Sequence, residues 1–321
     1  MSLDILAIVL PVFALIGLGY VLARTGILKE STGDALGQFV YVVGIPALLF
    51  KTLAVVQLGD QNPWQLWAAY FSGVAISWTF STLMIRKGFG RDARAGVIGG
   101  ISSVFSNSAM VGLPLISSVY GEAGQVPLLI LLSVHLPVMT VAIAILMERA
   151  AAKDGMAEAP DLPALILSVC KNLATNPIVL AIVAAVIWRT LKLPVTGIFA
   201  DVLGRLSSAA LPVALLSLGT SMVRYGIRGN VLPGILLSLV KIVLMPAIIF
   251  VLSAYVFHLP PIWTAAATLT AACPTGINVY IFASRYGTGH AMSANSITLT
   301  TMAAVVTSGI WVYLLDLWRM N

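Results

Sequence analysis

Charged residues are scarce in this sequence. Asp, Glu, Lys and Arg make up 9% of the 321 residues, whereas hydrophobic residues make up 59%. A soluble domain carries roughly 25% charged residues, and a soluble protein with so few could not cover its surface with polar groups. The composition therefore excludes soluble enzymes, nucleic-acid-binding proteins and disordered chains. It predicts an all-α protein that crosses the lipid bilayer several times.

Cysteines and catalytic motifs are also few. The two cysteines, Cys170 and Cys273, lie in apolar stretches, so no disulfide framework is indicated. The sequence contains no HExxH, GxSxG, P-loop or CxxC motif, which leaves hydrolase, ATPase and redox functions without support. We therefore expect no enzymatic activity, no cofactor and no metal site.

Ten apolar segments are long enough to cross a membrane. A helix needs roughly 20 apolar residues to span the hydrocarbon core. The first segment has no basic residue ahead of it, so we interpret it as a retained span rather than a signal peptide. The ten predicted spans cover residues 4–23, 34–55, 64–85, 95–120, 124–147, 164–188, 197–223, 231–257, 261–285 and 291–316.

The loop charges predict the orientation of these spans. Eleven Lys and Arg residues follow the odd-numbered spans, whereas five lie on the opposite side. Because cytoplasmic loops are enriched in basic residues, the loop after the third span and the linker at 148–163 are expected in the cytoplasm. This arrangement predicts a multi-pass protein of the plasma membrane with both termini outside the cytoplasm.

An internal repeat divides the chain into two halves. Pro11 and Pro177, Pro46 and Pro212, and the Tyr-Gly pairs that begin at residues 120 and 286 are each 166 residues apart. Five spans per half is an odd number, so the second half must enter the membrane from the opposite face. The sequence therefore predicts two inverted five-helix repeats, at 1–147 and 164–321, joined by the cytoplasmic linker 148–163.

The fourth and ninth spans are expected to break near the middle of the membrane. Proline removes a backbone donor, and a neighbouring glycine lets the helix unwind. In inverted-repeat transporters such broken helices form the binding site, although ordinary proline kinks are the simpler alternative. The candidate substrate-binding residues at the two breaks are Asn107, Ser108, Gly112, Pro114, Pro274, Thr275, Gly276 and Asn278.

The charge at these breaks favours an anionic substrate. Each break creates a helix N-terminus at mid-membrane, with free N–H groups and roughly half a positive elementary charge. None of the twelve acidic residues lies at the centre of a predicted span. Because antiporters of similar architecture bind cations through buried carboxylates, this absence argues against a cation as the main cargo.

Lys241 and His135 lie well inside predicted spans, which makes each a candidate functional residue. For Lys241, in the eighth span, four roles are open: a counter-ion for the substrate, a proton-responsive switch, a structural cation that binds carbonyl groups freed at a break, and a side chain that extends to the nearer interface. His135, in the fifth span, is a candidate for titration near neutral pH or for a neutral hydrogen-bonding residue.

Three stretches resemble the auxin efflux carrier family, which contains plant auxin exporters and bacterial PIN-like, malonate-permease-like transporters. They are FVYVVGIPALLFKTLA (39–54), SNSAMVGLPL (106–115) and PTGINVYIFASRYG (274–287), and the resemblance extends over essentially the whole chain. The long cytoplasmic loop of many plant members is missing. The resemblance therefore favours a compact prokaryotic member and makes auxin itself a poor candidate for the substrate.

The resemblance implies a fold like that of bile-acid and sodium/proton transporters. Spans 1, 2, 6 and 7 would form a scaffold. The transport core would consist of spans 3–5 and 8–10, in which the broken spans 4 and 9 cross each other. The core would move like an elevator, often within a homodimer. By the family pattern, Asn107 and the segment 274–278 would contact a substrate carboxylate. We expect a transporter of a small organic anion. The alternatives are a cation or proton antiporter of the same fold, and a membrane ligand sensor that moves nothing.

Overall fold

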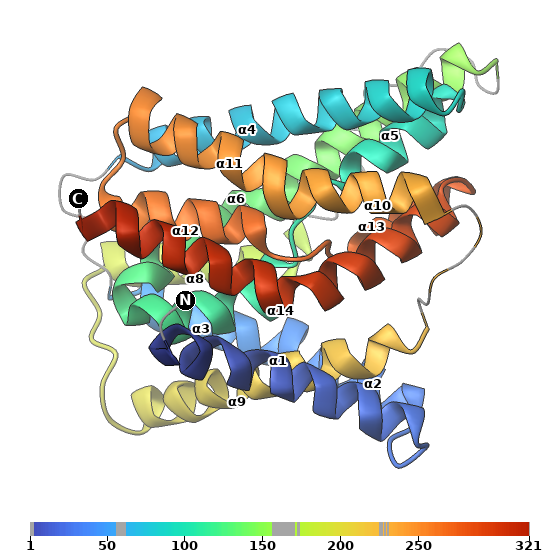
Figure 1. Ribbon diagram of the computed structural model, residues 1–321. Coiled ribbons are helices and arrows are strands. Elements are labelled where there is room, and N and C mark those ends of the chain that lie inside the picture. Colours follow the sequence, from blue (N-terminus) through green and yellow to red (C-terminus); the bar gives the residue numbers. More distant parts are fainter. Residues whose placement is uncertain are drawn as a thin grey trace.

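The computed structural model describes residues 3–55, 62–155, 171, 174–224, 227, 229 and 231–320. Within these residues the regular structure is helical, apart from one isolated β-bridge. The helices run side by side across Figure 1, and α1 begins and α14 ends toward the same end of the bundle. Cys170 and residues 156–163 of the predicted linker 148–163 lie outside the described residues.

Short π-helical turns (η) join several of the α-helices. The N-terminal half contains α1 (Leu3–Arg24), α2 (Glu30–Phe39), η1 (Val40–Gly44), α3 (Ile45–Leu53), α4 (Pro63–Leu83), η2 (Met84–Gly88), α5 (Ala93–Ser102), η3 (Ser108–Gly112) and α6 (Leu113–Lys153). The C-terminal half contains α8 (Pro177–Thr190), α9 (Gly197–Met222), α10 (Val231–Leu239), η4 (Val240–Leu244), α11 (Met245–Val251), η5 (Leu252–Val256), α12 (Pro261–Ala272), α13 (Asn278–Tyr286) and α14 (His290–Met320).

Seven helices in the described part of the chain are long and apolar enough to cross a membrane. One of them, Ser108–Lys153, has 46 residues, and a straight helix of that length would be about 70 Å long, over twice the thickness of the hydrocarbon core. Gly121, with φ 58° and ψ −150°, interrupts the helical conformation inside it, at the junction predicted between the fourth and fifth spans. Helix α6 then continues to Lys153, past the predicted end of the fifth span at residue 147.

The predicted breaks in the fourth and ninth spans are present. Helix α5 ends at Ser102 and helical structure resumes at Ser108, and helix α12 ends at Ala272 and helical structure resumes at Asn278. These half-length helices are too short to count as complete spans, which is one reason why the structure has fewer long helices than the ten predicted spans.

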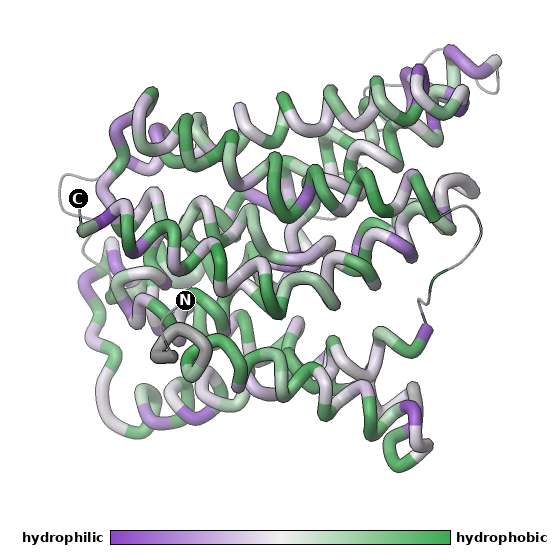
Figure 2. Tube along the Cα trace, viewed as in Figure 1, coloured by the Kyte–Doolittle hydropathy of each residue, from purple (hydrophilic) through white to green (hydrophobic). Residues whose placement is uncertain are grey.

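The outer faces of the long helices are apolar. Between 28% and 50% of each candidate span is buried inside the protein, and large side chains such as Leu10, Val183 and Met302 are at least half exposed. In Figure 2 hydrophobic colour runs along the helices, and hydrophilic colour is most frequent near their ends and connections. This distribution matches a protein whose sides face lipid.

Helices α1 and α9 approach each other closely because glycines face the contact. A Cβ atom on Gly19 would lie 2.3 Å from the carbonyl oxygen of Leu216, and one on Gly219 would lie 2.0 Å from that of Ile16. Small residues allow this kind of backbone contact between membrane helices, where apolar surface alone provides little driving force for association. The two helices therefore form a tightly packed pair on one side of the molecule.

The buried side chains form two main clusters. One joins α1, α3, α8 and α9 with the first half of α6 and with parts of α12 and α14, and includes Phe13, Leu49 and Leu215. The other joins α4, α5, α11 and α12 with the later part of α6, and includes Tyr70 and Met139. The molecule thus packs around two centres, and the helix breaks lie where they meet.

Asp154 connects the end of α6 to the beginning of α5. Its two carboxylate oxygens accept hydrogen bonds from the backbone N–H groups of Ala93 and Arg94, each at 3.0 Å, and the Arg94 Nε atom lies 3.4 Å away. Partial burial disfavours ionisation of Asp154, but these amides and the guanidinium outweigh it and hold the pKa of the carboxyl below its ordinary value of 3.8. The carboxylate therefore caps the helix that leads into the first break.

Asp154→Ala is expected to destabilise the protein by about 1–2 kcal/mol, the usual effect of losing a helix cap. A group with a lowered pKa stabilises the folded state above its ordinary pKa and loses that effect as the pH falls. The decrease in melting temperature relative to wild type should therefore be largest at neutral pH and should become smaller as the pH falls below 3.8. Asp201→Ala, at an exposed position of α9, is the matched control. Equal melting temperatures for both variants and wild type would contradict the capping role.

Candidate functional site

The two helix breaks lie side by side and pair through their backbones. The Asn107 N–H donates to the Pro274 carbonyl at 2.8 Å, and the Gly276 N–H donates to the Phe105 carbonyl at 2.8 Å. This antiparallel β-bridge joins Ser106 to Thr275. Each break therefore provides hydrogen-bond partners for backbone groups of the other break that have no partner within their own helix. A non-helical segment at membrane depth needs such partners, because lipid provides none.

Thr275 holds the crossing together with its side chain and its backbone. Its hydroxyl donates to the Ser102 carbonyl at the end of α5, at 2.8 Å, and its N–H donates to the Thr300 hydroxyl on α14, at 2.9 Å. Thr275 is completely buried. It was predicted to bind substrate, but the structure places it within the hydrogen-bonded frame of the crossing.

A second side-chain contact comes from Lys241 on η4. Its ammonium group donates to the Ser106 hydroxyl at 3.0 Å and to the Ala271 carbonyl at the end of α12. Lys241 is fully buried, so the side chain does not extend to the membrane interface. Of the four roles considered for it, these contacts match a structural cation that binds a carbonyl group freed at a break.

A cavity of about 440 Å³ lies beside the crossing. One wall is formed by the two breaks and α6, including Asn107, His135 and Asn278. The facing wall is formed by α2, η1, α8 and α9. The cavity therefore lies between the two packing centres of the molecule.

The predicted break residues divide into two groups of four. Those that line the cavity are Asn107, Ser108, Gly276 and Asn278, and those that do not are Gly112, Pro114, Pro274 and Thr275. Members of the second group shape the breaks. A Cβ atom on Gly112 would lie 3.2 Å from the Cys273 sulfur, and Pro114 is in the first turn of α6.

Two side chains of the cavity wall carry buried polar atoms without a protein partner among the described residues. The unpartnered atoms are the Nδ2 atom of Asn107 and both ring nitrogens of His135. Asn107 is 7% exposed and His135 is 3% exposed. His135 lies among aromatic rings, 5.2 Å from Phe105 and 5.7 Å from Tyr70 between ring centroids. Because buried polar groups in proteins are almost always hydrogen-bonded, these atoms are candidates for contact with a bound molecule.

Two helix N-termini also border the cavity. Helix η3 begins at Ser108 and α13 begins at Asn278, and residues of both first turns line the cavity. The first N–H groups of a helix have no partner within it, and they carry partial positive charge. This wall of the cavity is therefore suited to an anion.

The facing wall contains polar residues that were not identified from the sequence. They include Asp34, Gln38, Tyr41 and Ser217. The Asp34 carboxylate also pairs with Arg224, which does not line the cavity, at 2.6 Å between Oδ2 and a guanidinium nitrogen. The polar stretch ESTGDALGQF, within an otherwise apolar region, was the available signal. Its pairing with α9 could not be recognised because the two segments are far apart in the chain.

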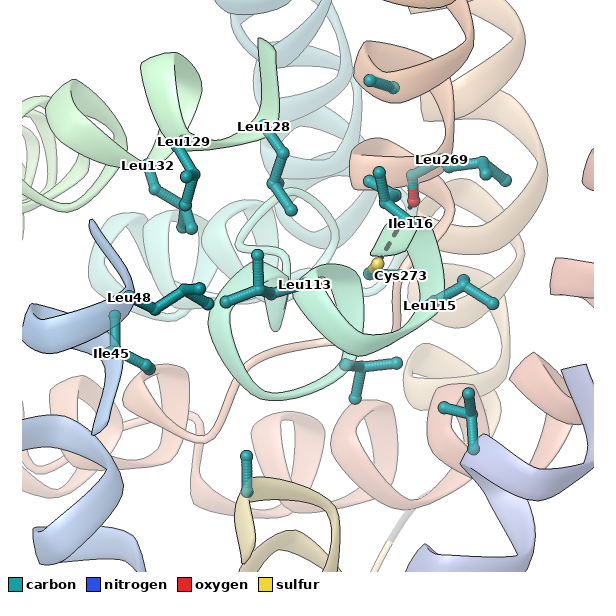
Figure 3. Close-up of a cluster of buried hydrophobic side chains, with 14 of the residues drawn as sticks. Ile45, Leu48, Leu113, Leu115, Ile116, Leu128, Leu129, Leu132, Leu269 and Cys273 are labelled. Carbon is teal, nitrogen blue, oxygen red and sulfur yellow. Dashed lines mark hydrogen bonds between the residues drawn. The ribbon is translucent and has the colours of Figure 1, made fainter. Parts of the chain in front are cut away.

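A second cavity of about 400 Å³ lies between α3, α6 and α9, and its wall includes Lys51, Glu122 and Ser208. Ile45 lines the first cavity, whereas Leu48, one helical turn later, lines the second. Figure 3 shows Ile45 and Leu48 beside the buried leucines of α6. An apolar layer thus separates the two cavities.

Comparison with known proteins identifies similar chains. Residues 4–312 match the family model described as membrane transport protein. A protein of Rhizobium meliloti (strain 1021) named "Putative malonate transporter" is 26% identical over 97% of this chain and 96% of its own length. A protein of Methanothermobacter thermautotrophicus named "Uncharacterized transporter" is 25% identical over 94% of this chain and 96% of its own length.

Thr275→Val is expected to destabilise the crossing by about 1–3 kcal/mol, because it leaves the buried Ser102 carbonyl without its hydroxyl donor. Thr275→Ser retains a hydroxyl and should remain close to wild type. Thermal unfolding of the purified proteins measures both changes. A Thr275→Val variant as stable as wild type would remove this hydrogen bond from the frame of the site.

Proposed function

The chain belongs to the membrane transport protein family, the family of the auxin efflux carriers, and we propose that it carries a small organic anion with a carboxylate group across the plasma membrane. The family is one of transporters rather than enzymes. The observation that supports this substrate class most strongly is the buried, unpartnered amide nitrogen of Asn107, in a cavity where two helix N-termini meet.

A carboxylate fits the chemistry of this cavity wall. Its oxygens only accept hydrogen bonds, and the wall offers donors: the Asn107 amide, the Asn278 amide and the N–H groups at the start of η3 and α13. The volume is within the usual range for a small-molecule site. The name of the Rhizobium relative supports malonate as a first candidate.

We further propose the complete architecture expected from the sequence, with ten crossings in two inverted repeats, 1–147 and 164–321. Helices α1–α3, α8 and α9 would form the scaffold, and α4–α6 and α10–α14 the transport core. The burial of α1, α3, α8 and α9 in one cluster, and of α4, α5 and α11 in the other, supports this assignment, although α6 and α12 contribute residues to both clusters and α14 to the first. A homodimer joined through the scaffold, with all termini outside the cytoplasm, completes the proposal.

Transport would proceed by an elevator-like movement of the core against the scaffold. The first cavity includes Asp34 and Ser221, near the ends of α2 and α9 that are predicted to face the cytoplasm. The second cavity lies on the other side of the apolar layer near Leu48, away from Asp34 and Ser221. We therefore propose that this conformation is open to the cytoplasm and closed on the other side.

A cation antiporter is the less favoured alternative. The described wall of the first cavity contains one carboxylate, Asp34, which already pairs with Arg224. A non-transporting sensor would bind the anion without exchanging it across the membrane. Counterflow of labelled malonate in proteoliposomes separates a carrier from such a sensor.

Asn107→Ala and Asn278→Ala are each expected to weaken malonate binding by about 10- to 100-fold, because each removes one hydrogen bond to a charged group. The measurement is the malonate-dependent rise in melting temperature of purified protein, followed by malonate uptake into proteoliposomes. Gln65→Ala removes an exposed amide of α4 and serves as the control. Wild-type binding and uptake by both asparagine variants would exclude these residues from the site.

The proposed inward-open conformation is testable with single cysteines. In a protein with Cys170 and Cys273 replaced by serine, Ser221→Cys should react with a membrane-impermeant maleimide from the cytoplasmic side, and malonate should slow the reaction. Ser208→Cys, in the second cavity, is the matched position and should react from the opposite side. Labelling of both cysteines from one side would contradict the proposed arrangement.

A further inference from the structure

Four half-helix ends meet at the crossing, and their charges nearly cancel. The N-termini of η3 and α13 and the C-termini of α5 and α12 all lie at the two paired breaks. A helix N-terminus carries roughly half a positive elementary charge and a C-terminus roughly half a negative one. Summed over all four ends, the helix dipoles therefore leave the crossing close to neutral, and the preference for anions that they provide comes only from the two N-termini that border the cavity.

The two C-termini are capped by different groups. At the end of α5 the Ser102 carbonyl accepts from the Thr275 hydroxyl, which is neutral. At the end of α12 the Ala271 carbonyl accepts from the Lys241 ammonium. The crossing is thus asymmetric, because a hydroxyl group caps one of these helix ends and the Lys241 side-chain nitrogen caps the other.

No carboxylate among the described residues pairs with Lys241. Its ionisable neighbours are the Cys273 thiol, the His135 ring and the Tyr70 hydroxyl, which shares the Ser106 hydroxyl with it at 3.4 Å. Ser106 itself lines the cavity next to Asn107. The side-chain nitrogen of Lys241 is therefore one hydrogen bond away from the cavity wall.

The position of the ammonium resembles that of a bound cation. In cation-coupled carriers with broken helices, unwound carbonyls and half-helix C-terminal ends coordinate Na⁺. Here a terminal carbonyl and a hydroxyl surround the lysine nitrogen instead. When it is protonated, the side chain places a positive charge in the kind of position where such carriers bind Na⁺.

We propose that Lys241 is the fixed cation of the substrate site: it supplies the positive charge that selects anions and makes substrate binding independent of Na⁺. The proposal rests on the proposed transport of a carboxylate. Because Lys241 does not line the cavity, it acts through Ser106 and through the field at the crossing, as a positioning residue rather than a direct ligand.

The test measures malonate binding to purified protein in Na⁺ and in choline buffers. Wild-type protein should bind equally well in both. Lys241→Ala should bind at least about tenfold more weakly in choline, because a nearby unit charge is lost. Na⁺ or methylammonium should restore part of the lost affinity by occupying the vacated position. Lys51→Ala, which removes an exposed lysine at the second cavity, should behave as wild type.

Each outcome decides the proposal. Wild-type affinity of Lys241→Ala in choline would overturn it, and so would a folded variant whose weakened binding no cation restores. If Lys241→Ala does not fold, the wild-type comparison decides, because a requirement for Na⁺ would contradict a fixed cation and equal binding in both buffers would support it. Failure of wild-type protein to bind any carboxylate would instead refute the proposed function.

Discussion

The backbone pairing of the two breaks is the interaction on which the rest of the structure depends. Within a membrane, an amide or carbonyl group without a partner costs several kcal/mol, so one broken helix at this depth would be strongly unfavourable. The reciprocal hydrogen bonds around Ser106 and Thr275 solve this problem for both breaks at once. They also leave the amide of Asn107 free to face the cavity, because its backbone, and not its side chain, makes the pairing contact.

The crossing also explains how a mostly apolar protein presents a polar site. Hydroxyl groups and Lys241 cap the carbonyl groups at the helix ends, and the N-terminal first turns border the cavity. The facing wall belongs to other helices, so the proposed elevator movement would change the exposure of the cavity. In lipid, separating two apolar surfaces costs little free energy, whereas breaking a buried hydrogen-bond network costs much more. We therefore expect the crossing to move as one unit.

Much of the helical framework could be predicted from the sequence. Hydropathy located the long helices to within a few residues, and the Gly, Pro and Asn residues of the fourth and ninth spans located both breaks. The candidate residues were less uniform than predicted. Asn107 and Asn278 line the cavity, whereas Thr275 and Pro274 hold the breaks together, since neighbours in an extended segment point in different directions. The wall formed by α2 and α9 was missed because no local pattern pairs segments so distant in the chain.

The sequence by itself determined that the chain lies in a membrane, where its helices run and where two of them break, because length, hydropathy and backbone chemistry act locally. Only the tertiary structure decided which of the broken ends meet, which side chains cap them and which remain free. Those outcomes depend on contacts between residues more than a hundred positions apart, such as Lys241 with Ser106. A lysine in an apolar helix has several possible roles until its partners are known, and here the tertiary structure shows those partners to be Ser106 and the end of α12.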